Sequence, residues 1–369
     1  MRAVTSDEHR LLHSFRREER FRVVVKRRNG ETVDLSDRVL SISVDFSADE
    51  PVAVCDVEFD DAWTVYGASR SLSPLIAQSV YNQPEPLLWP ENELYVYVGF
   101  ADLGQPVTNW RLLFHGVLGD EITPRGTRDS RTVSVRCRDL AKRLQDRFIY
   151  GEWLYGSEEG VSVVAVIQGI LNQAFGDGAI ILHVKDNPNF MIYPVRLGNC
   201  SVWDALQNLL KPTGYQIRYW YWPAGSVAYN CEGNPIHVAT EDFYLTVVDP
   251  KRDRNTADDA LNVDRDTITE EALGISDATI RNDFWVRYYD RDTKQYMEVH
   301  EEDMESIAKY GRRVMVVGQD SVPYIDTYPE AQALIAVLRN DLTEPPATDR
   351  LKTQMLYHIE PFDLLDAVS

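Results

Sequence analysis

The histidines are the residues best suited to acid–base chemistry near neutral pH, and they are scattered along the chain. None belongs to an H-E-x-x-H pair or to another spacing typical of metal ligands. His9 and His13 are four residues apart and could share a helix face, but no carboxylate-rich site accompanies them. The sequence therefore predicts no metal site. The seven histidines are His9, His13, His115, His183, His237, His300 and His358.

The cysteines offer a second route to chemistry, as thiolate nucleophiles or as disulfides. They lie far apart and none belongs to a C-x-x-C pair, so neither a zinc knuckle nor a disulfide framework is expected. Cys200, next to a predicted helix start, or Cys231 could be combined with His183 or His237 into a nucleophile and base. Their local sequence does not otherwise favour a thiolate site. We interpret the four as buried free thiols that pack as small apolar residues. They are Cys55, Cys137, Cys200 and Cys231.

Carboxylates are too abundant to identify an active site. With 58 Asp and Glu residues in the chain, a pair suited to glycoside hydrolysis can be drawn almost anywhere. The sequence also lacks a glycine-rich loop of the kind that cradles phosphates. We therefore expect no catalytic residue, no metal and no cofactor, and a protein that is not an enzyme.

The charge of the chain is acidic and unevenly distributed. A formal net charge of -20 and a pI near 4.8 argue against a protein that wraps nucleic acid, because phosphate contacts need Lys and Arg. Residues 1–30 are the exception, with nine Lys or Arg and four Asp or Glu. Residues 1–20 are predicted to form a basic arm, which either docks on a neighbour or is a solvated helix. Its candidate docking residues are Arg10, Arg16, Arg17 and Arg20.

The 369 residues, 44% of them hydrophobic, suffice for two or three domains. No apolar run approaches the roughly 18–20 residues that span a bilayer. The charged N-terminus also lacks the hydrophobic region of a secretory signal. We expect a protein without a membrane span that is assembled in a cytoplasm.

Residues 21–148 are predicted to form a first β domain. The run Phe21–Lys26 leads into Asn29-Gly30, and both of these turn residues tolerate the positive φ of a tight hairpin. Apolar and polar residues alternate over 42–46 and 53–60, which places one face of each strand in a core. About six strands in one segment are typical of a barrel or sandwich. The remaining strand patterns cover 94–100, 110–118 and 132–138.

Residues 149–248 are predicted to form a small α+β domain. Apolar residues keep helical spacing over 163–174 until Gly176 ends the pattern. Ser201 and Asp204 fit a capping box, in which a hydroxyl and a carboxylate satisfy free N–H groups at a helix start. Two strand patterns follow, over 215–222 and 243–248.

The strand pattern over 215–222 carries an aromatic cluster with two interpretations. The cluster is either a platform for carbohydrate or protein, or a strand buried on both faces by its own domain and a neighbouring subunit. We favour burial. The candidate contact residues are Tyr219, Trp220, Tyr221 and Trp222.

Residues 249–275 are charge-dense and free of aromatics, which predicts an acidic linker. Residues 276–369 are predicted to form a second β domain with one helix. Its hairpin is expected over 278–300, and its helix over 331–342 stops before Pro345. The candidate core or subunit-interface residues are Phe284, Trp285, Val286 and Tyr288.

Three local patterns accompany this layout. Phe114-His115-Gly116 ends a strand, and Ser201–Leu206 begins a helix that leads to a strand at Tyr215. Ser306–Arg312 precedes the helix over 331–342. In this order of elements the sequence resembles the hub proteins of long-tailed bacteriophages and their relatives in contractile injection systems. The resemblance covers most of residues 20–369, but Asp61–Asn92 and the first twenty residues have no counterpart in that family.

The resemblance implies a mainly β, α+β fold with two tail-tube-like β-barrel domains and a small α+β insert. In that family three chains form a pseudo-sixfold ring, so a homotrimer at the tail tip or baseplate of a virion is implied. The implied partners are the tail tube or distal tail ring, the tape measure protein and a spike or fibre. Genomic DNA would pass through the lumen without specific binding, and an acidic lumen suits that passage because like charge repels DNA.

Two other functions are compatible with the sequence. A peripheral carbohydrate- or receptor-binding tail module would use exposed Trp and Tyr side chains. A cell-wall hydrolase carried on a hub scaffold is the other. Ring assembly distinguishes the hub from the peripheral module, and digestion of purified cell wall tests for the hydrolase.

Overall fold

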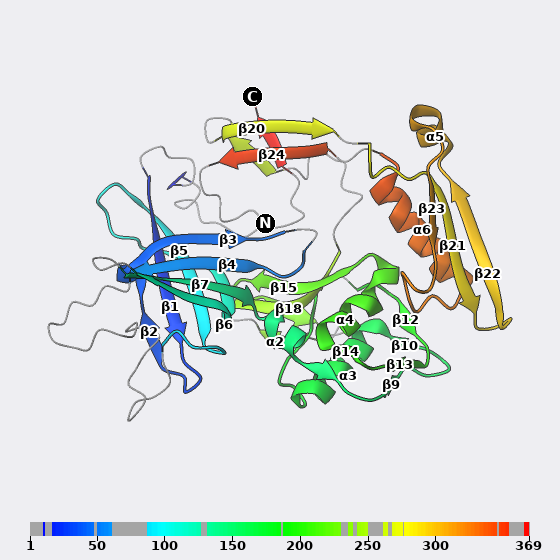
Figure 1. Cartoon of the computed structure of the whole chain (residues 1–369), viewed down its shortest axis with the longest axis horizontal. Coiled ribbons are helices and arrows are strands. Elements are labelled where there is room, and N and C mark those ends of the chain that lie inside the picture. Colours follow the sequence, from blue (N-terminus) through cyan, green and yellow to red (C-terminus); the bar gives the residue numbers. More distant parts are fainter. Residues whose placement is uncertain are drawn as a thin grey trace.

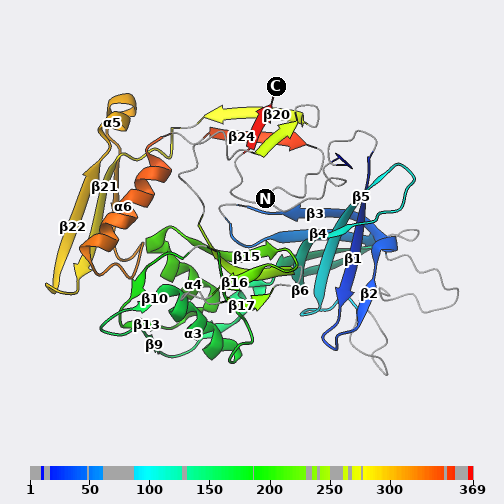
Figure 2. The same ribbon diagram turned by 180° about the vertical axis from the view of Figure 1, so that it is seen from behind.

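The computed structural model describes residues 10–11, 17–47, 50–60, 87–126, 131–185, 187–229, 235–238, 242–249, 261–264, 268–275, 277–344, 347–353 and 365–368. Strands predominate over helices there, so the chain is mainly β, as predicted. Figures 1 and 2 show a curved sheet at one end, an α+β unit in the middle and a helix-covered sheet at the other end. Within the described ranges, no helix combines the length and apolarity needed to cross a membrane.

The N-terminal unit is one antiparallel sheet of seven strands. They are β1 (Arg17–Lys26), β2 (Thr32–Asp34), β3 (Val39–Asp45), β4 (Val54–Asp60), β5 (Glu93–Asp102), β6 (Trp110–Gly126) and β7 (Arg131–Asp139). Their order in the sheet is β2-β1-β5-β6-β7-β4-β3, and a 3-10 turn, η1 (Ser36–Arg38), precedes β3. Cys55, Val57 and Phe59 of β4 are buried while their neighbours are not, which confirms the predicted alternation.

The predicted hairpin at Asn29-Gly30 joins β1 to β2. Gly30 has a φ of 86° and donates its N–H to the carbonyl of Arg27 at 2.9 Å. Arg27 in turn donates its N–H to the carbonyl of Glu31 at 2.8 Å, and its buried guanidinium pairs with the Glu31 carboxylate at 2.7 Å. Positive φ at glycine therefore sets this turn, as the sequence indicated.

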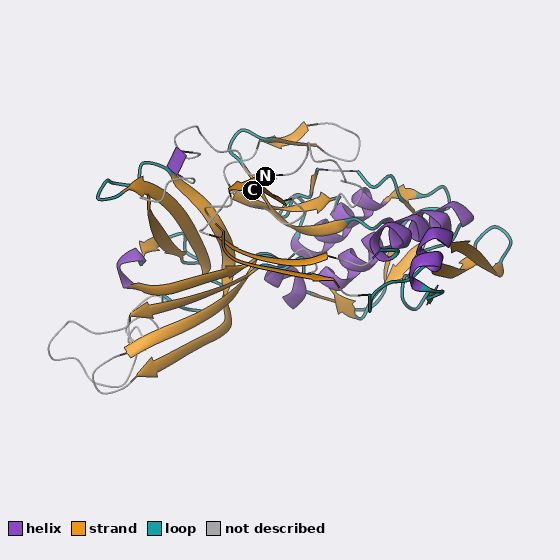
Figure 3. Cartoon of the chain, turned by 90° about the horizontal axis from the view of Figure 1, so that it is seen from above, coloured by secondary structure: helices purple, strands orange, loops and turns teal. Residues whose placement is uncertain are grey.

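The first sheet is curved but open. Its edge strands β2 and β3 are not paired with each other, and the described part of the chain contains no closed barrel. Figure 3 shows the strands of this sheet fanning out, with most of the helices gathered on the other side of the molecule. The mainly β class is confirmed, whereas the two predicted barrels stay a prediction.

The central unit contains both helices and strands. Its helices are α2 (Ala141–Asp146), α3 (Val163–Phe175) and α4 (Val202–Leu210), followed by a 3-10 turn, η2 (Lys211–Thr213). Its main sheet has the order β15 (Gln216–Trp222), β18 (Asp242–Val248), β11 (His183–Val184), β16 (Val227–Tyr229) and β17 (Pro235–Val238). Short two-stranded pairs join β8 (Phe148–Ile149) to β14 (Cys200–Ser201), β9 (Trp153–Tyr155) to β13 (Val195–Leu197), and β10 (Val161–Ser162) to β12 (Met191–Ile192).

The ends of α3 and α4 follow the sequence signals. The Ser201 hydroxyl accepts the Asp204 N–H at 3.0 Å and so caps the start of α4. Gly176 ends α3 with a φ of 101°. The buried faces of both helices, among them Ile167 and Leu206, form one core with Ile217 of β15.

Two strand pairs lie near the C-terminal end of the chain. β20 (Ile268–Ile275) pairs antiparallel with β24 (Ala347–Thr353), and β19 (Leu261–Asp264) pairs parallel with β25 (Leu365–Val368). β19 and β20 fall within residues 249–275, which we predicted as a linker, so part of that range is sheet. Backbone pairing stabilises a strand whatever its polarity, and the charged composition therefore misled the prediction.

Residues 277–344 form a compact module between β20 and β24. It contains β21 (Asp283–Asp290), β22 (Gln295–Glu302), α5 (Met304–Tyr310), β23 (Val314–Val317) and α6 (Tyr328–Leu342). The predicted hairpin and helix are present, and α6 begins at a capping box of Thr327 and Glu330. The three strands, in the order β22-β21-β23, have α6 packed on one face. Because Ile275 pairs with Ala347, this module is an insertion between two paired strands.

Gly116 provides a test of how tightly β6 and β7 approach. A Cβ at this position would fall against the Arg138 carbonyl and the Phe114 ring. Gly116→Ala should therefore destabilise the protein by about 1–3 kcal/mol, the usual cost of overpacking. Gly318→Ala is the control, because a Cβ there meets open space, and it should change stability by less than about 0.5 kcal/mol. Urea unfolding measures both, and equal effects would contradict the close approach.

Candidate functional site

Two groups of polar side chains connect different secondary-structure elements. One group lies at the joint between the first sheet and the α+β unit. The other lies on the face of β21 and β22 that α6 leaves uncovered. Both are built on strands, so their side chains are held by the register of the sheets.

The joint between the two units has an apolar part made of aromatic rings. Phe46, from the loop after β3, stacks on Phe243 of β18 with ring centroids 6.3 Å apart. Leu112 of β6 packs in the same cluster with Tyr221 of β15. The buried Arg218 donates to the carbonyl of Ser47 at 2.6 Å. The joint therefore buries apolar surface, and the hydrogen bond from Arg218 to Ser47 orients the two units relative to each other.

The four aromatic residues predicted as a contact surface lie at or near this joint. Trp220 and Tyr221 are buried, and Tyr219 and Trp222 are half-buried. Trp222 donates its Nε1–H to the Thr246 hydroxyl at 2.9 Å. Tyr219 and Tyr221 pack in the cluster with Leu112 of the first sheet. Burial against a neighbouring subunit stays a prediction.

His115 of β6 is the central residue of the joint group, which we define as His115, Glu93, Tyr95, Arg143 and Asp242. The His115 ring is only 5% exposed. Its Nδ1 lies 2.8 Å from Asp242 Oδ1, and its Nε2 lies 3.6 Å from Glu93 Oε2. Burial alone would lower the pKa of His115, but the facing carboxylates of Asp242 and Glu93 outweigh it and raise that pKa.

Glu93 of β5 contacts two further members of the joint group, Arg143 and Tyr95, and also Lys26. Arg143 of α2 contacts its carboxylate at 2.7 Å, Lys26 of β1 at 3.2 Å and the Tyr95 hydroxyl at 2.8 Å. The contact with His115, together with Arg143 and Tyr95, holds the pKa of Glu93 well below its usual range despite burial. Glu93 is therefore ionised at neutral pH.

Asp139 lies close to the joint group and behaves differently. Its carboxylate accepts the N–H groups of Ala53 at 2.8 Å and Ala141 at 2.9 Å. Complete burial nevertheless raises the pKa of Asp139 to about 7. The pKa values of these two carboxyl groups near His115 are therefore shifted in opposite directions. Glu93 has cations beside it, whereas Asp139 accepts hydrogen bonds from backbone N–H groups.

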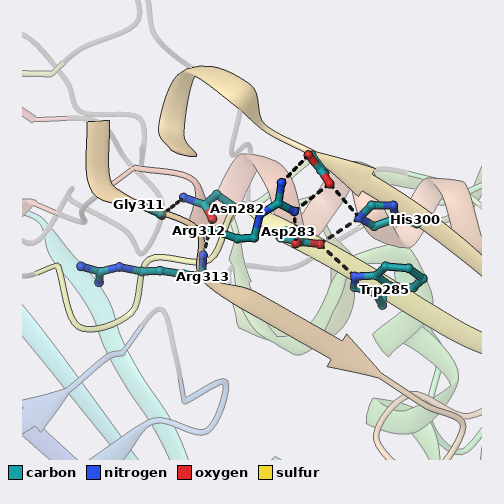
Figure 4. Close-up of polar contacts among 8 residues, drawn as sticks. Asn282, Asp283, Trp285, His300, Gly311, Arg312 and Arg313 are labelled. Carbon is teal, nitrogen blue, oxygen red and sulfur yellow. Dashed lines mark hydrogen bonds and ion pairs between the residues drawn. The ribbon is translucent and has the colours of Figure 1, made fainter. Parts of the chain in front are cut away.

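The second group, which we name the sheet-face group, consists of Asp283, His300, Glu302 and Arg312 (Figure 4). Asp283 is buried and accepts from His300 Nε2 and from Trp285 Nε1, each at 2.9 Å. Arg312 bonds both Asp283 and Glu302, the latter at 2.7 and 3.0 Å. The Trp285 ring stacks on His300 with centroids 4.0 Å apart. The three hydrogen bonds outweigh burial and lower the pKa of Asp283.

Asn282 fixes the position of Arg312. Its side-chain amide donates to the Gly311 carbonyl at 2.9 Å and accepts the Arg313 N–H at 2.7 Å (Figure 4). These bonds clamp the backbone on both sides of Arg312. The guanidinium is thereby aimed at the two carboxylates.

The sheet-face group has the donor types of a metal site but not its charge. Ligand atoms of Asp283, His300 and Glu302 lie within 4.8 Å of one another. The Arg312 guanidinium bonds both carboxylates, so a metal ion would have to displace a cation that is already hydrogen-bonded. We therefore interpret the group as an ion-pair network that neutralises the buried Asp283.

The structure separates the four residues predicted on β21. Phe284, Val286 and Tyr288 are buried against α6 and form the core of the inserted module. Trp285 points to the opposite face, is half-buried and belongs to the surroundings of Asp283. Alternation along one strand accounts for this separation.

The basic arm is only partly described. Arg10 pairs with Asp102 of β5 at 3.0 Å, and Arg20 pairs with Glu18 at 3.0 Å. Both pairs are exposed and lie within this chain. Arg16 and the side chain of Arg17 lie outside the described residues, although the backbone of Arg17 begins β1.

The cysteine and histidine pairs considered as nucleophiles are not brought together in the described residues. Burial raises the pKa of the Cys200 thiol, and nearby Asp204 adds to the rise. His183 is completely buried and stacks on Tyr244 at 4.5 Å. The side chains of Cys231 and His237 lie outside the described residues.

The sequence reasoning missed both polar groups. The joint group could have been suspected from His115, which lies within the apolar run Leu112–Leu118. A polar side chain buried in such a run requires hydrogen-bond partners. The second depends on the register that sets Asp283 opposite Glu302 and Trp285 opposite His300. The spacing of these residues in the sequence does not report that register.

The chain is similar in structure to solved tail proteins. The tail protein from Neisseria meningitidis MC58 matches with a TM-score of 0.55 and 13% identity, over 90% of this chain and 80% of that one. The 43 kDa tail protein of prophage MuSo2 from Shewanella oneidensis matches with a TM-score of 0.50 and 14% identity, over 85% and 76%. No protein-family model and no curated protein matches the sequence. The chain therefore has the fold of tail proteins, and the resemblance is confirmed at that level.

Removal of Asp283 tests the sheet-face group. Asp283→Ala should destabilise the protein by about 1–3 kcal/mol at neutral pH. The substitution removes the buried carboxylate that accepts hydrogen bonds from Trp285, His300 and Arg312. The folded state depresses the pKa of Asp283, so its contribution is present above the unfolded pKa of about 4 and is lost as pH falls. The difference between wild type and variant should therefore shrink in acid.

Glu298→Ala is the matched control for Asp283→Ala. Glu298 pairs with Arg287 at 2.9 Å on the same sheet, but both side chains are about half exposed. Its removal should change stability by less than about 1 kcal/mol. Thermal unfolding across a pH series measures both variants. A pH-independent loss in Asp283→Ala would contradict an ionised, stabilising carboxylate.

Proposed function

We propose that the chain is a structural subunit of a tail hub, a ring that connects the tail tube or distal ring to the spike or receptor-binding tip. The observation that carries this proposal is the tail-protein fold, matched over 90% of this chain in one solved structure and 85% in another. Three copies would form the ring with pseudo-sixfold symmetry. The tape measure protein and a spike or fibre would be its neighbours in the virion.

The charge of the chain supports a hub through which DNA passes. A net charge of -20 opposes adhesion of the phosphate backbone to the protein, so genomic DNA would cross the lumen without specific binding. The described basic side chains Arg20, Arg143 and Arg312 are held by carboxylates of this chain. The proposed role needs no cofactor and no turnover.

The inserted module supports an alternative as a peripheral binding unit. Tyr296 is 81% exposed and Tyr289 is 38% exposed, and their rings lie 5.3 Å apart on the sheet. Exposed aromatic pairs favour contact with a carbohydrate or a protein receptor. Such contact is compatible with a hub position or with a separate peripheral one.

The oligomeric state distinguishes these roles. Light scattering of the purified chain, alone and mixed with its neighbouring tail proteins, should give a mass near three times 42.3 kDa for the ring component. Electron microscopy of assembled particles should place it on the tail axis with threefold symmetry. A chain that stays monomeric in the mixture and sits off the axis would contradict the hub and favour the peripheral binding unit.

A further inference from the structure

The joint group places one buried imidazole between carboxylates of two different units. Glu93 belongs to β5 of the first sheet, and Asp242 belongs to β18 of the α+β unit. His115 Nδ1 lies 2.8 Å from Asp242, and Nε2 lies 3.6 Å from Glu93. A doubly protonated ring can present an N–H to each carboxylate, and its charge opposes both of theirs.

The 3.6 Å contact of Nε2 with Glu93 is longer than a hydrogen bond, and Nε2 has no hydrogen-bond partner among the described residues. A neutral imidazole can therefore keep its single N–H on Nδ1 for Asp242, but it loses its positive charge and turns the Nε2 lone pair toward the Glu93 carboxylate. The ring is 5% exposed and stacks on Tyr95 at 4.0 Å, which leaves little solvent to relieve the repulsion. Loss of the proton therefore acts at the boundary between the two units.

The two carboxylates depend on His115 to different degrees. Glu93 retains Lys26 and Arg143 as cationic partners when the imidazole is neutral. Among the described residues, no cation other than His115 lies within ion-pair distance of Asp242, whose Oδ1 otherwise accepts the Phe243 N–H at 2.7 Å. Deprotonation therefore weakens the attachment of β18 more than that of β5.

Other charged and titratable groups lie near the His115 ring and act electrostatically on its protonation. Asp139, whose charge also acts on the joint, loses its own proton in the neutral range and so adds negative charge as pH rises. Tyr95 and Tyr219 keep their protons, because burial raises their pKa values. The charged and titratable groups near the joint are Lys26, Glu93, Tyr95, Asp139, Arg143, Arg218, Tyr219 and Asp242.

We propose that His115 is a proton-dependent lock between the first sheet and the α+β unit, closed when the imidazole is charged and loosened when it is neutral. The lock belongs to the single chain and does not depend on ring assembly. Folding that raises a histidine pKa stabilises the protein below the unfolded pKa, and this stabilisation is lost as pH rises through the folded pKa. The joint should therefore loosen as pH rises above the pKa of a free histidine.

Hydrogen exchange at the joint tests the lock. In the full chain, protection of amides in β18 and β6, corrected for intrinsic exchange, should fall between about pH 6 and about pH 9. The fall should be about tenfold for each unit by which folding raises the His115 pKa. Amides of α3, inside the α+β core, should keep their protection and serve as an internal reference.

Variants identify His115 as the origin of this pH dependence. His115→Gln should show low joint protection at both pH values, whereas His300→Gln, in the sheet-face group, should keep the wild-type profile at the joint. If His115→Gln fails to fold, NMR titration of the imidazole in wild type and Asp242→Asn replaces it. The titration midpoint should be above that of a free histidine in wild type and lower in Asp242→Asn. Joint protection that is independent of pH in wild type, or a midpoint unchanged by Asp242→Asn, would overturn the proposal.

Discussion

The contact between the first sheet and the α+β unit is the interaction on which the rest of the arrangement depends. The inserted module packs on the α+β unit, with Arg291 lying over the Tyr193 ring at 3.7 Å and α6 beside η2. The α+β unit therefore contacts both the first sheet and the inserted module. This order of contacts, from sheet to α+β unit to module, is visible along the length of Figure 1.

Both polar groups solve the same physical problem. A carboxylate buried at a contact costs free energy unless a cation and hydrogen bonds compensate it. Asp283 obtains its cation from Arg312, a residue placed by a different segment, and Glu93 obtains Arg143 and Lys26. Asp139 has hydrogen bonds from the backbone, and its pKa is raised to about 7. Asp283 and Glu93 thus have cations beside them that favour the ionised carboxylate, whereas burial dominates at Asp139.

Local features of the fold were predictable from the sequence, and long-range ones were not. The Asn29-Gly30 hairpin, the Ser201 cap and the helix over 331–342 depend on neighbouring residues, and all three are present. The pairing of Ile275 with Ala347 depends on residues about seventy positions apart, so the inserted module was predicted as part of a second β domain over 276–369. Likewise, Tyr221 packs with Leu112 of the first sheet, a contact between units that strand periodicity does not reveal. The two polar groups were missed for the same reason, because each assembles across registers.

The low identity to the matched tail proteins is consistent with what defines this fold. The chain matches these structures at thirteen to fourteen per cent identity. The alternation of apolar and polar residues, the helix caps and the core volume specify such a fold, and many different residues satisfy each of these requirements. Contacts such as His115 with Asp242 are not required by that pattern, since an apolar pair of similar volume could fill a joint as well. The buried ionisable joint is therefore a feature that the pattern of the fold does not by itself require.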